Sequence, residues 1–388
     1  MKIVRLGDIA KIVSGSTAPK DSQFGDEGIP FIRAGHLKEL CNGLQLKSLP
    51  KIEECLIKGM VRVPKDTVVF AKSGMSCMKG RIYKTTDEAY IVNHLAGVIC
   101  TDVIMPNYLK YYFKYFQPNK LVLDDSYPSI RLNDISDLMI SLPEIELQNK
   151  IADILDKAQE LIDKRKEQIE ACDELIKGLF YHTASDVCKE EYELIELITG
   201  IEAGWSVGGE ERRLEEGEIG VLKISAVTKG VFNDIEYKVI DKSIVIKKAV
   251  KCRKGDILFS RANTREMVGA SCIVPKDFNN LIIPDKLWKI SVDINKANPR
   301  YFQYILSLPE TRSEISNVAT GSSGSMLNIS MDKLKKIKIN LVELNYQNKF
   351  IKDLEKIEQQ KSLMQQSLTQ LENNFNSLMQ RAFKGELF

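Results

Sequence analysis

The chain contains two copies of one long unit, and this repetition limits its possible folds more than any other feature of the sequence. The segment LPEIELQNKIADIL, which begins at Leu142, is matched by LVELNYQNKFIKDL, which begins at Leu341. The offset of 199 residues aligns Gln148 with Gln347. Self-similarity indicates repeated structure, and a unit of this length is too long for a solenoid repeat. The sequence therefore predicts a duplicated domain.

Five further pairs of segments follow one another in the same order in both copies. They are VRLGDIAKIVSG from Val4 and YELIELITGIEAG from Tyr192, GIPFIRAGHL from Gly28 and GEIGVLKISAV from Gly217, DTVVFAKSG from Asp66 and GDILFSRAN from Gly255, MPNYLKYYF from Met105 and NPRYFQYIL from Asn298, and SIRLNDISDLMISLP from Ser129 and NISMDKLKKIKINLV from Asn328. The offset drifts from about 188 to 199 residues, as small loop insertions would cause. This favours two copies of a domain followed by a helix.

Each domain mixes strands and helices. VVFAKSG and DILFSRA are short runs rich in β-branched and aromatic residues, which is typical of strands. The segments that begin at Pro106 and Pro299 carry apolar residues three and four positions apart, which predicts helices. We therefore predict an α+β fold with two tandem, pseudo-symmetric domains separated by helices.

A heptad pattern follows each domain. Apolar residues alternate in steps of four and three at positions 151, 155, 158, 162, 165, 169, 172, 176 and 179, and again 199 residues later. This period is typical of a coiled coil, and its long basic members, Arg165 and Lys361, can lie at the edge of the seam. About thirty helical residues span about 45 Å, the order of one DNA turn between two sites. We predict two antiparallel helices; the alternative is a hairpin that only packs against the domains.

The formal net charge is only +2, so any surface for nucleic acid must be local. Seven basic residues and one acid lie between Lys58 and Lys84, and the same ratio recurs between Lys247 and Arg265. Both segments overlap equivalent strands of the two copies. This favours DNA binding, in which phosphates supply affinity and base edges supply specificity.

Candidate DNA-contacting residues lie where these strands end and in loops before later helices. In the first copy they are Lys72, Ser73, Lys79 and Arg81, with Arg33, Tyr127, Ser129 and Arg131. In the second copy they are Arg261, Asn263, Thr264 and Arg265, with Lys223, Ser322 and Ser323. Arginine reads guanine and asparagine reads adenine in the major groove. A solubilising surface or a local salt bridge is the alternative role for each residue.

Catalytic motifs are missing from the sequence. No G-x-x-x-x-G-K-[ST], G-x-G-x-x-G, H-E-x-x-H, G-x-S-x-G or Asn/Asp-Pro-Pro-aromatic sequence occurs. Pro284-Asp285 followed by Lys286 is similar to part of a nuclease motif, but no Glu-x-Lys follows at a useful spacing. These absences argue against an ATP-driven motor, a methyltransferase or a nuclease in this chain.

The cysteines and the N-terminus bear on metal binding and location. The eight cysteines show no C-x-x-C spacing and there are only three histidines, which argues against a zinc site and for reduced thiols. The N-terminal segment is unlike a signal peptide, and no apolar stretch approaches 18 residues. We therefore expect a cytoplasmic protein with no membrane span.

Jointly, these motifs resemble the DNA specificity subunit of type I restriction–modification enzymes. The resemblance rests on GDILFSRANT, NISMDKLKKIKINL, the Gln-Asn-Lys start of each heptad helix and the closing FNSLMQRAFKGELF, and it covers essentially the whole chain. Two details differ. Leu341-Val342 stands where the first copy has Leu142-Pro143, and Leu147 and Tyr346 stand where an acid is expected.

The resemblance implies that the chain reads double-stranded DNA and performs no catalysis. Each domain would read one half of a bipartite target, and the helices would set the gap and dock two methyltransferase subunits. Motor/nuclease subunits would join, and S-adenosylmethionine, ATP and Mg²⁺ would belong to these partners rather than to this chain. The expected limits are residues 1–141 and 187–340 for the domains and 142–186 and 341–388 for the helices. The alternatives are a stand-alone DNA-binding regulator and an enzyme with an unrecognised site.

Overall fold

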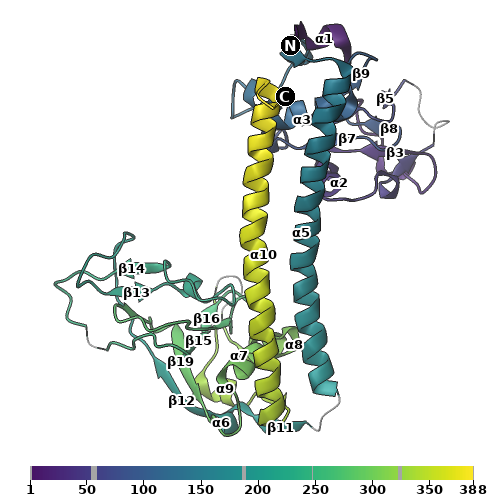
Figure 1. The fold of residues 1–388 in the computed structure, drawn as a ribbon. Coiled ribbons are helices and arrows are strands. Elements are labelled where there is room, and N and C mark those ends of the chain that lie inside the picture. Colours follow the sequence, from purple (N-terminus) through teal and green to yellow (C-terminus); the bar gives the residue numbers. More distant parts are fainter. Residues whose placement is uncertain (1, 54–58, 186–188, 247, 322–325, 388) are drawn as a thin grey trace. The chain divides into compact units, whose positions relative to one another are not determined.

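The computed structural model describes residues 2–53, 59–185, 189–246, 248–321 and 326–387. The chain divides into two compact units (Figure 1). Unit 1 is Met1–Gln168 with Met364–Phe388, and unit 2 is Ile169–Leu363. Each unit therefore combines one domain with parts of two long helices.

Unit 1 is built on two four-stranded sheets. The first is antiparallel, in the order β2 (Ala10–Ser14), β9 (Leu95–Cys100), β6 (Val68–Ala71) and β7 (Ile82–Lys84). The second has the order β4 (Lys51–Ile52), β3 (Ile29–Ile32), β8 (Ala89–Ile91) and β5 (Arg62–Val63), and β3 runs parallel to β8. A separate antiparallel pair joins β1 (Lys2–Arg5) to β10 (Met139–Leu142).

The main helix of this domain is α3 (Pro106–Phe116), which starts at a proline as its sequence predicts. Its Phe113 packs on Phe70 of β6 with ring centroids 4.9 Å apart. Shorter helices complete the domain; they are α1 (Leu6–Ile9), α2 (Leu37–Cys41) and α4 (Leu132–Ser136).

Unit 2 repeats this order of elements. Its antiparallel sheet runs β12 (Ile198–Ala203), β19 (Leu287–Val292), β15 (Ile257–Ser260) and β17 (Ser271–Ile273). Its second sheet runs β14 (Tyr237–Val239), β13 (Gly220–Leu222) and β18 (Leu281–Ile282), and β13 is parallel to β18. The pairs β11 (Glu190–Glu193) with β21 (Lys338–Leu341) and β16 (Ala262–Asn263) with β20 (Leu327–Asn328) are antiparallel. The helices are α6 (Leu194–Leu197), α7 (Pro299–Ser307), α8 (Pro309–Val318) and α9 (Met331–Lys335).

The shared strand order confirms the predicted duplication and the α+β class. In both units the first strand pairs with the last, and the second sheet contains one parallel pair, β3 with β8 in unit 1 and β13 with β18 in unit 2. The copies differ in detail, because unit 2 adds α8 after α7.

The two heptad segments form α5 (Ile145–Ser185) and α10 (Leu344–Lys384), each of 41 residues. At about 1.5 Å per residue each spans about 60 Å, more than the thirty-residue seam predicts. In unit 1 the start of α5, with Leu155, shares a core with the end of α10, with Phe375. In unit 2 the end of α5, with Phe180, shares a core with the start of α10, with Phe350. The helices are therefore antiparallel, as predicted.

The seam positions of both helices are buried or half-buried, whereas most of their other positions are exposed. The two polar members of the seam also follow the pattern. Arg165 is half-buried, and Lys361 Nζ donates a hydrogen bond to Asp173 of α5 within unit 2. In unit 1 the helices are linked by an ion pair between Lys166 and Glu372 at 3.3 Å. The precise limits predicted for domains and helices stay a prediction.

A glutamine ties the start of each long helix to the domain before it. The side-chain oxygen of Gln148 accepts from Met105 N at 2.8 Å, and its nitrogen donates to Val103 O at 3.0 Å and to Pro143 O at 2.9 Å. Gln347 makes the equivalent three bonds, with Asn298 N at 2.9 Å, Lys296 O at 3.0 Å and Val342 O at 2.7 Å. Both side chains are fully buried. The repeated Gln-Asn-Lys sequence thus marks a docking point between helix and domain.

Candidate nucleic-acid interface

In unit 1 the ends of several strands meet in one row. Because β3 and β8 are parallel, their carboxyl ends share one edge, and Val92 N donates to Ile32 O at 3.0 Å. The row continues through Lys72, whose backbone N donates to His94 O at 2.9 Å and whose carbonyl accepts from Ile130 N at 2.7 Å. We call this row rim 1. It consists of Ser16, Arg33, Lys72 to Gly74, Asn93 to His94 and Tyr127 to Arg131.

Unit 2 has the same row, here called rim 2. Trp205 N donates to Ile283 O at 3.2 Å, Arg261 N donates to Lys286 O at 3.1 Å, and Ile329 N donates to Arg261 O at 3.0 Å. Rim 2 consists of Trp205 to Ser206, Lys223, Arg261 to Arg265, Asp285 to Lys286 and Asn328 to Ile329. Lys72 and Arg261 therefore occupy equivalent backbone positions.

A glycine permits the close approach of one strand to the centre of each rim. A Cβ atom on Gly15 would lie 2.1 Å from Ile91 O, and one on Gly204 would lie 1.9 Å from Ile283 O. Only glycine fits such a position, because it has no Cβ. Both glycines belong to the first matched pair of segments, which explains why that part of the repeat is recognisable.

Rim 1 brings together five of the candidates from two distant segments. Ser73 forms a β-bridge with Ser129, and Gly74 N donates to Pro128 O at 2.9 Å. Tyr127 beside them is 86% exposed, and Arg131 is exposed as well. In the described part of the chain no carboxylate lies within ion-pair distance of Lys72, so its charge is available to a ligand.

Lys79 and Arg81 lie further along the same connection between β6 and β7. Lys79 ends the short 3₁₀ helix η5 (Cys77–Lys79), which packs on η6 (Pro118–Leu121). Arg81 lies near Cys41: burial raises the pKa of this thiol, whereas the charges of Lys114 and Arg81 lower it. Lys79 therefore lies in a segment that packs on η6, and Arg81 lies near α2.

Arg33 and Lys223 occupy matching places, each directly after a central strand of the smaller sheet. Arg33 donates to Asp21 at 3.1 Å and its guanidinium lies 4.9 Å from the centre of the Phe24 ring. Lys223 pairs with Glu211 at 3.3 Å and with Glu236 at 3.6 Å. Hydrogen bonding to Glu211 raises the pKa of the Lys223 ammonium. Neighbouring acids thus offset both charges.

The second-copy candidates surround the end of β15. Arg261 Nε donates to Asp285 O at 3.0 Å, and its guanidinium lies 5.9 Å from the centre of the Trp288 ring. Asn263 is half-buried in β16, whereas Thr264 and Arg265 are exposed directly after it. Ser322 and Ser323 lie outside the described residues.

The two basic segments do not form single patches. Lys84 pairs with Asp66 at 2.6 Å, and Arg62 pairs with Glu88. In unit 2, Lys254 precedes β15 and Arg261 follows it, so the extended strand separates their charges. Counting charges along the sequence therefore overestimated the positive charge at any one place on the surface. Among these basic residues, only those at the ends of strands belong to the rims.

The rims also contain exposed or half-buried polar residues that charge and strand patterns do not single out. Asn93 and His94 lie at the centre of rim 1, and Asp285 and Lys286 occupy the same position in rim 2. Each pair directly precedes a long buried strand, β9 or β19. This shared position directly before β9 and β19 was the sequence signal that could have identified the two pairs.

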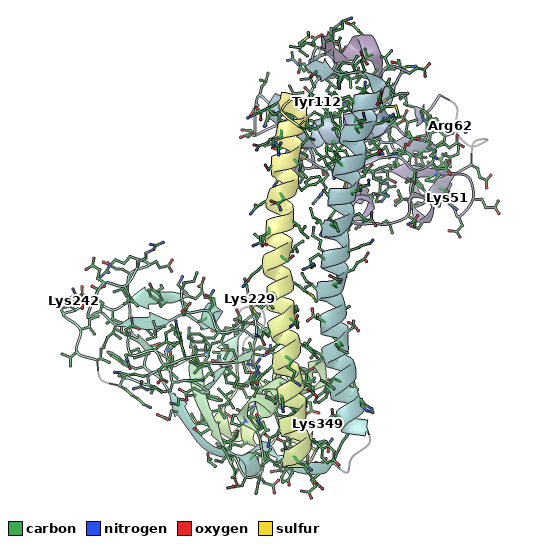
Figure 2. All side chains as sticks on the ribbon, in the orientation of Figure 1. Lys51, Arg62, Tyr112, Lys229, Lys242 and Lys349 are labelled. Atoms are coloured by element: carbon green, nitrogen blue, oxygen red, sulfur yellow. The ribbon has the colours of Figure 1, made fainter. Side chains whose placement is uncertain are left out.

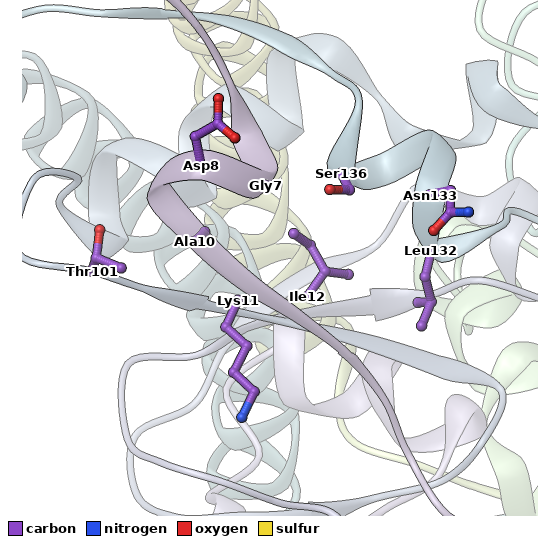
Figure 3. Close-up of a pocket in the computed structure, with 9 residues that line it drawn as sticks. All are labelled: Gly7, Asp8, Ala10, Lys11, Ile12, Thr101, Leu132, Asn133 and Ser136. Carbon is purple, nitrogen blue, oxygen red and sulfur yellow. The ribbon is translucent and has the colours of Figure 1, made fainter.

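A pocket drawn in Figure 3 lies at the other end of the β2–β9 pair from rim 1. Lys11 and Asn133 line it, and Lys11 pairs with Ile99, whereas rim 1 follows Ser14, which pairs with Ala96. Among the described residues, no three His, Cys, Asp or Glu side chains gather so that they could hold a metal ion.

The described cysteines form no disulfide, and burial raises the pKa of the Cys100, Cys252 and Cys272 thiols to about 12. Such thiols remain protonated at neutral pH. None of the helices in the described ranges has a stretch that is both long and apolar enough to cross a bilayer.

Three relatives among known proteins are specificity subunits of type I restriction enzymes. The EcoEI subunit of Escherichia coli is 30% identical over 41% of this chain and 27% of its own length. The MjaIX subunit of Methanocaldococcus jannaschii is 28% identical over 43% of this chain and 40% of its own length. These matches span less than half of either relative. The EcoKI subunit of Escherichia coli is 23% identical over 99% of this chain and 89% of its own length.

Solved structures share the fold over the whole chain. The S subunit of a type I restriction–modification system from M. genitalium has a TM-score of 0.59 at 16% identity, covering 98% of this chain and 96% of that one. A chain from a type I R-M system described for its complex assembly has a TM-score of 0.61 at 17% identity, covering 100% and 98%. The model of the type I restriction modification DNA specificity domain matches residues 1–171 and 190–373. The chain therefore belongs to the family of type I restriction–modification DNA specificity proteins.

Proposed function

We propose that this chain is the DNA-reading subunit of a type I restriction–modification enzyme, in which each unit reads one half of a bipartite double-stranded target. The observation that carries the proposal is the pair of rims. Both rims use the same backbone hydrogen bonds, yet they present different side chains. One scaffold with two sets of side chains suits a target whose two halves have different sequences.

Each rim combines the two kinds of contact that sequence-specific binding requires. Lys72, Arg131 and Arg265 supply positive charge for phosphates, and Ser73, Asn263 and Thr264 supply hydrogen-bonding groups for base edges. Arg261 suits guanine, because its Nε donates to Asp285 O while its terminal nitrogens have no hydrogen-bond partner among the described residues.

The long helices complete this proposed function. They set the gap between the two half-sites and provide the docking surface for two methyltransferase subunits, which motor/nuclease subunits join. Catalysis then belongs to the partners, as do S-adenosylmethionine, ATP and Mg²⁺, and the complex acts in the cytoplasm. The family membership and the absence of catalytic motifs support this division of labour.

The test is selection of DNA from a randomised duplex library by the full chain, alone and co-expressed with the DNA methyltransferase encoded beside it in its host. We expect a two-part sequence with a fixed gap, and co-purification of the methyltransferase. Arg261→Ala should weaken binding by about 1–3 kcal/mol through one half-site, and the equivalent Lys72→Ala should weaken binding through unit 1.

Three results would contradict the proposal. Selection of no two-part sequence in either form would exclude bipartite reading. Tight two-part binding without any methyltransferase association would instead indicate a stand-alone regulator. Methyl transfer by the purified chain alone, with S-adenosylmethionine, would show that catalysis is not confined to partners.

A further inference from the structure

We infer that Asn93-His94 in rim 1 and Asp285-Lys286 in rim 2 are the central base-reading pairs of the two units. The inference rests on the proposed function. It assigns base specificity to residues that are not among the candidate DNA-contacting residues predicted from the sequence. The two pairs are structurally equivalent, because His94 O accepts from Lys72 N and Lys286 O accepts from Arg261 N.

The backbone of the first pair is held from both sides. Asn93 N donates to Ser16 O at 2.8 Å, and Asn93 O accepts from Ser14 Oγ at 3.3 Å. The side-chain amide of Asn93 is exposed and has no partner among the described residues. A rigid backbone that presents a free amide is suited to recognition, because little conformational entropy is lost on binding.

His94 is oriented by its neighbour. Its Nδ1 atom lies 2.7 Å from Ser73 Oγ, a hydrogen bond that fixes the ring and leaves Nε2 facing away from Ser73. His94 is exposed, and Lys72 next to Ser73 supplies a positive charge beside it. The pair therefore offers one amide and one ring nitrogen side by side. An asparagine amide matches the N6 and N7 atoms of adenine in the major groove.

The second pair carries different chemistry on the same backbone. The carboxylate of Asp285 accepts a hydrogen bond from Ser206, and Lys286 is half-buried with no ion pair in the described part of the chain. A carboxylate would be repelled by phosphates, so its place is over a base edge, where it can accept from cytosine N4. Lysine suits guanine O6 and N7. We therefore assign adenine to the Asn93 position and cytosine with guanine to the Asp285-Lys286 position.

The test transfers the second pair onto the first. The double variant Asn93→Asp, His94→Lys and the wild-type chain, each in the form that selects a two-part sequence, are passed through the randomised duplex library. We expect the preferred base at one or two adjacent positions of a single half-site to change from adenine to cytosine or guanine. The preference should change by roughly 10- to 100-fold, and the other half-site and the gap should stay the same.

The control for the asparagine exchange is Asn133→Asp, which makes the same Asn-to-Asp substitution in the pocket of Figure 3, at the other end of the β2–β9 pair from rim 1. Its selected sequence should equal that of the wild type. If the double variant fails to fold by circular dichroism, the reciprocal variant Asp285→Asn, Lys286→His tests the same assignment in unit 2.

The outcomes separate this inference from the proposed function. If the wild type selects a two-part sequence and the folded exchange variant selects the same bases at every position, the assignment of these pairs is wrong. If the wild type selects no two-part sequence, the proposed function itself fails. A change at both half-sites would also overturn the inference, because each pair belongs to one unit only.

Discussion

Gln148 and Gln347 explain why the start of each long helix is the most recognisable part of the repeat. An amide side chain both donates and accepts, and each glutamine uses both capacities on backbone groups of the preceding loop. A glutamate lacks the donor and an alanine lacks both, so neither can replace the glutamine without leaving buried backbone groups unpaired.

Gln148→Ala should therefore destabilise unit 1 by roughly 2–4 kcal/mol, since a buried N–H and buried carbonyls lose their partner. Urea unfolding would measure the loss, and Gln347→Ala should have a similar effect on unit 2. The neighbouring Asn149 is exposed, and its replacement by alanine should change stability by at most about 0.5 kcal/mol. Equal effects of the two substitutions would contradict the docking role.

Glu218 of unit 2 gives a pH-dependent prediction. Hydrogen bonds from Arg212, at 2.7 and 2.9 Å, and from Glu215 N hold the pKa of this carboxyl at about 2. Because the folded pKa lies below the unfolded value of about 4.3, the stabilisation is present above pH ~4.5 and is lost as pH falls through the folded pKa.

Glu218→Gln should therefore lower the Tm of unit 2 at pH 7, and the difference from wild type should shrink towards pH 2. Calorimetric scans between pH 2 and 7 would measure it. Glu216→Gln changes an exposed glutamate two residues away and should leave the pH profile unaltered. A difference in Tm that is constant across this range would show that Glu218 does not act through its charge.

At the scale of elements, each long helix starts in the core of one unit, and its other end completes the core of the other unit. Phe383, near the end of α10, packs on Tyr108, Tyr112 and Tyr115, and Tyr112 is labelled beside this end of the helix in Figure 2. Phe180, near the end of α5, packs in the same way on Tyr301, Tyr304 and Phe350 of unit 2.

Phe383→Ala should destabilise unit 1 by about 3–5 kcal/mol, the usual cost of removing a buried phenylalanine ring. Hydrogen exchange followed by mass spectrometry should show faster exchange in α3, with unit 2 unchanged. Phe180→Ala should give the reverse result, with faster exchange in α7. Leu363→Ala, at a position that is 51% exposed, is the control. Faster exchange in both units of a single variant would contradict this assignment.

The sequence predicted these elements well but not the rims. Helix α3 begins at Pro106 and the buried strand at Val68, as local propensity and apolar pattern indicate. Rim 1, in contrast, joins residues near 16, 33, 72, 94 and 130 through backbone bonds that no linear pattern records. Charge counts along the chain therefore pointed to Arg81, which lies outside rim 1, and not to His94, which lies in it.

At the scale of the whole chain, the two matched helices are the proposed measure of the gap in the DNA. Seven residues of helix rise by about 10 Å, close to three base pairs, and turn the helix by nearly two full turns. Removing one heptad from both helices therefore changes length while keeping the seam in phase.

Deleting residues 165–171 and 365–371 together should shorten the selected gap by about three base pairs and leave both half-sites the same. Selection from the randomised library measures both. Deleting 165–171 alone shortens α5 but not α10, so the two helices no longer match in length. This single deletion should abolish two-part binding. An unaltered gap in the folded double deletion would exclude the helices as the determinant of spacing.

The place of the C-terminal segment has a consequence for how the chain is made. Met364–Phe388 belongs to the same unit as the first domain, and Phe383 fills its core. A ribosome adds about 5–20 residues per second, so the first domain waits roughly 10–40 s after its own synthesis before its missing part emerges. The domain translated first is thus the last to close, and nascent chains should need chaperone protection there during this interval.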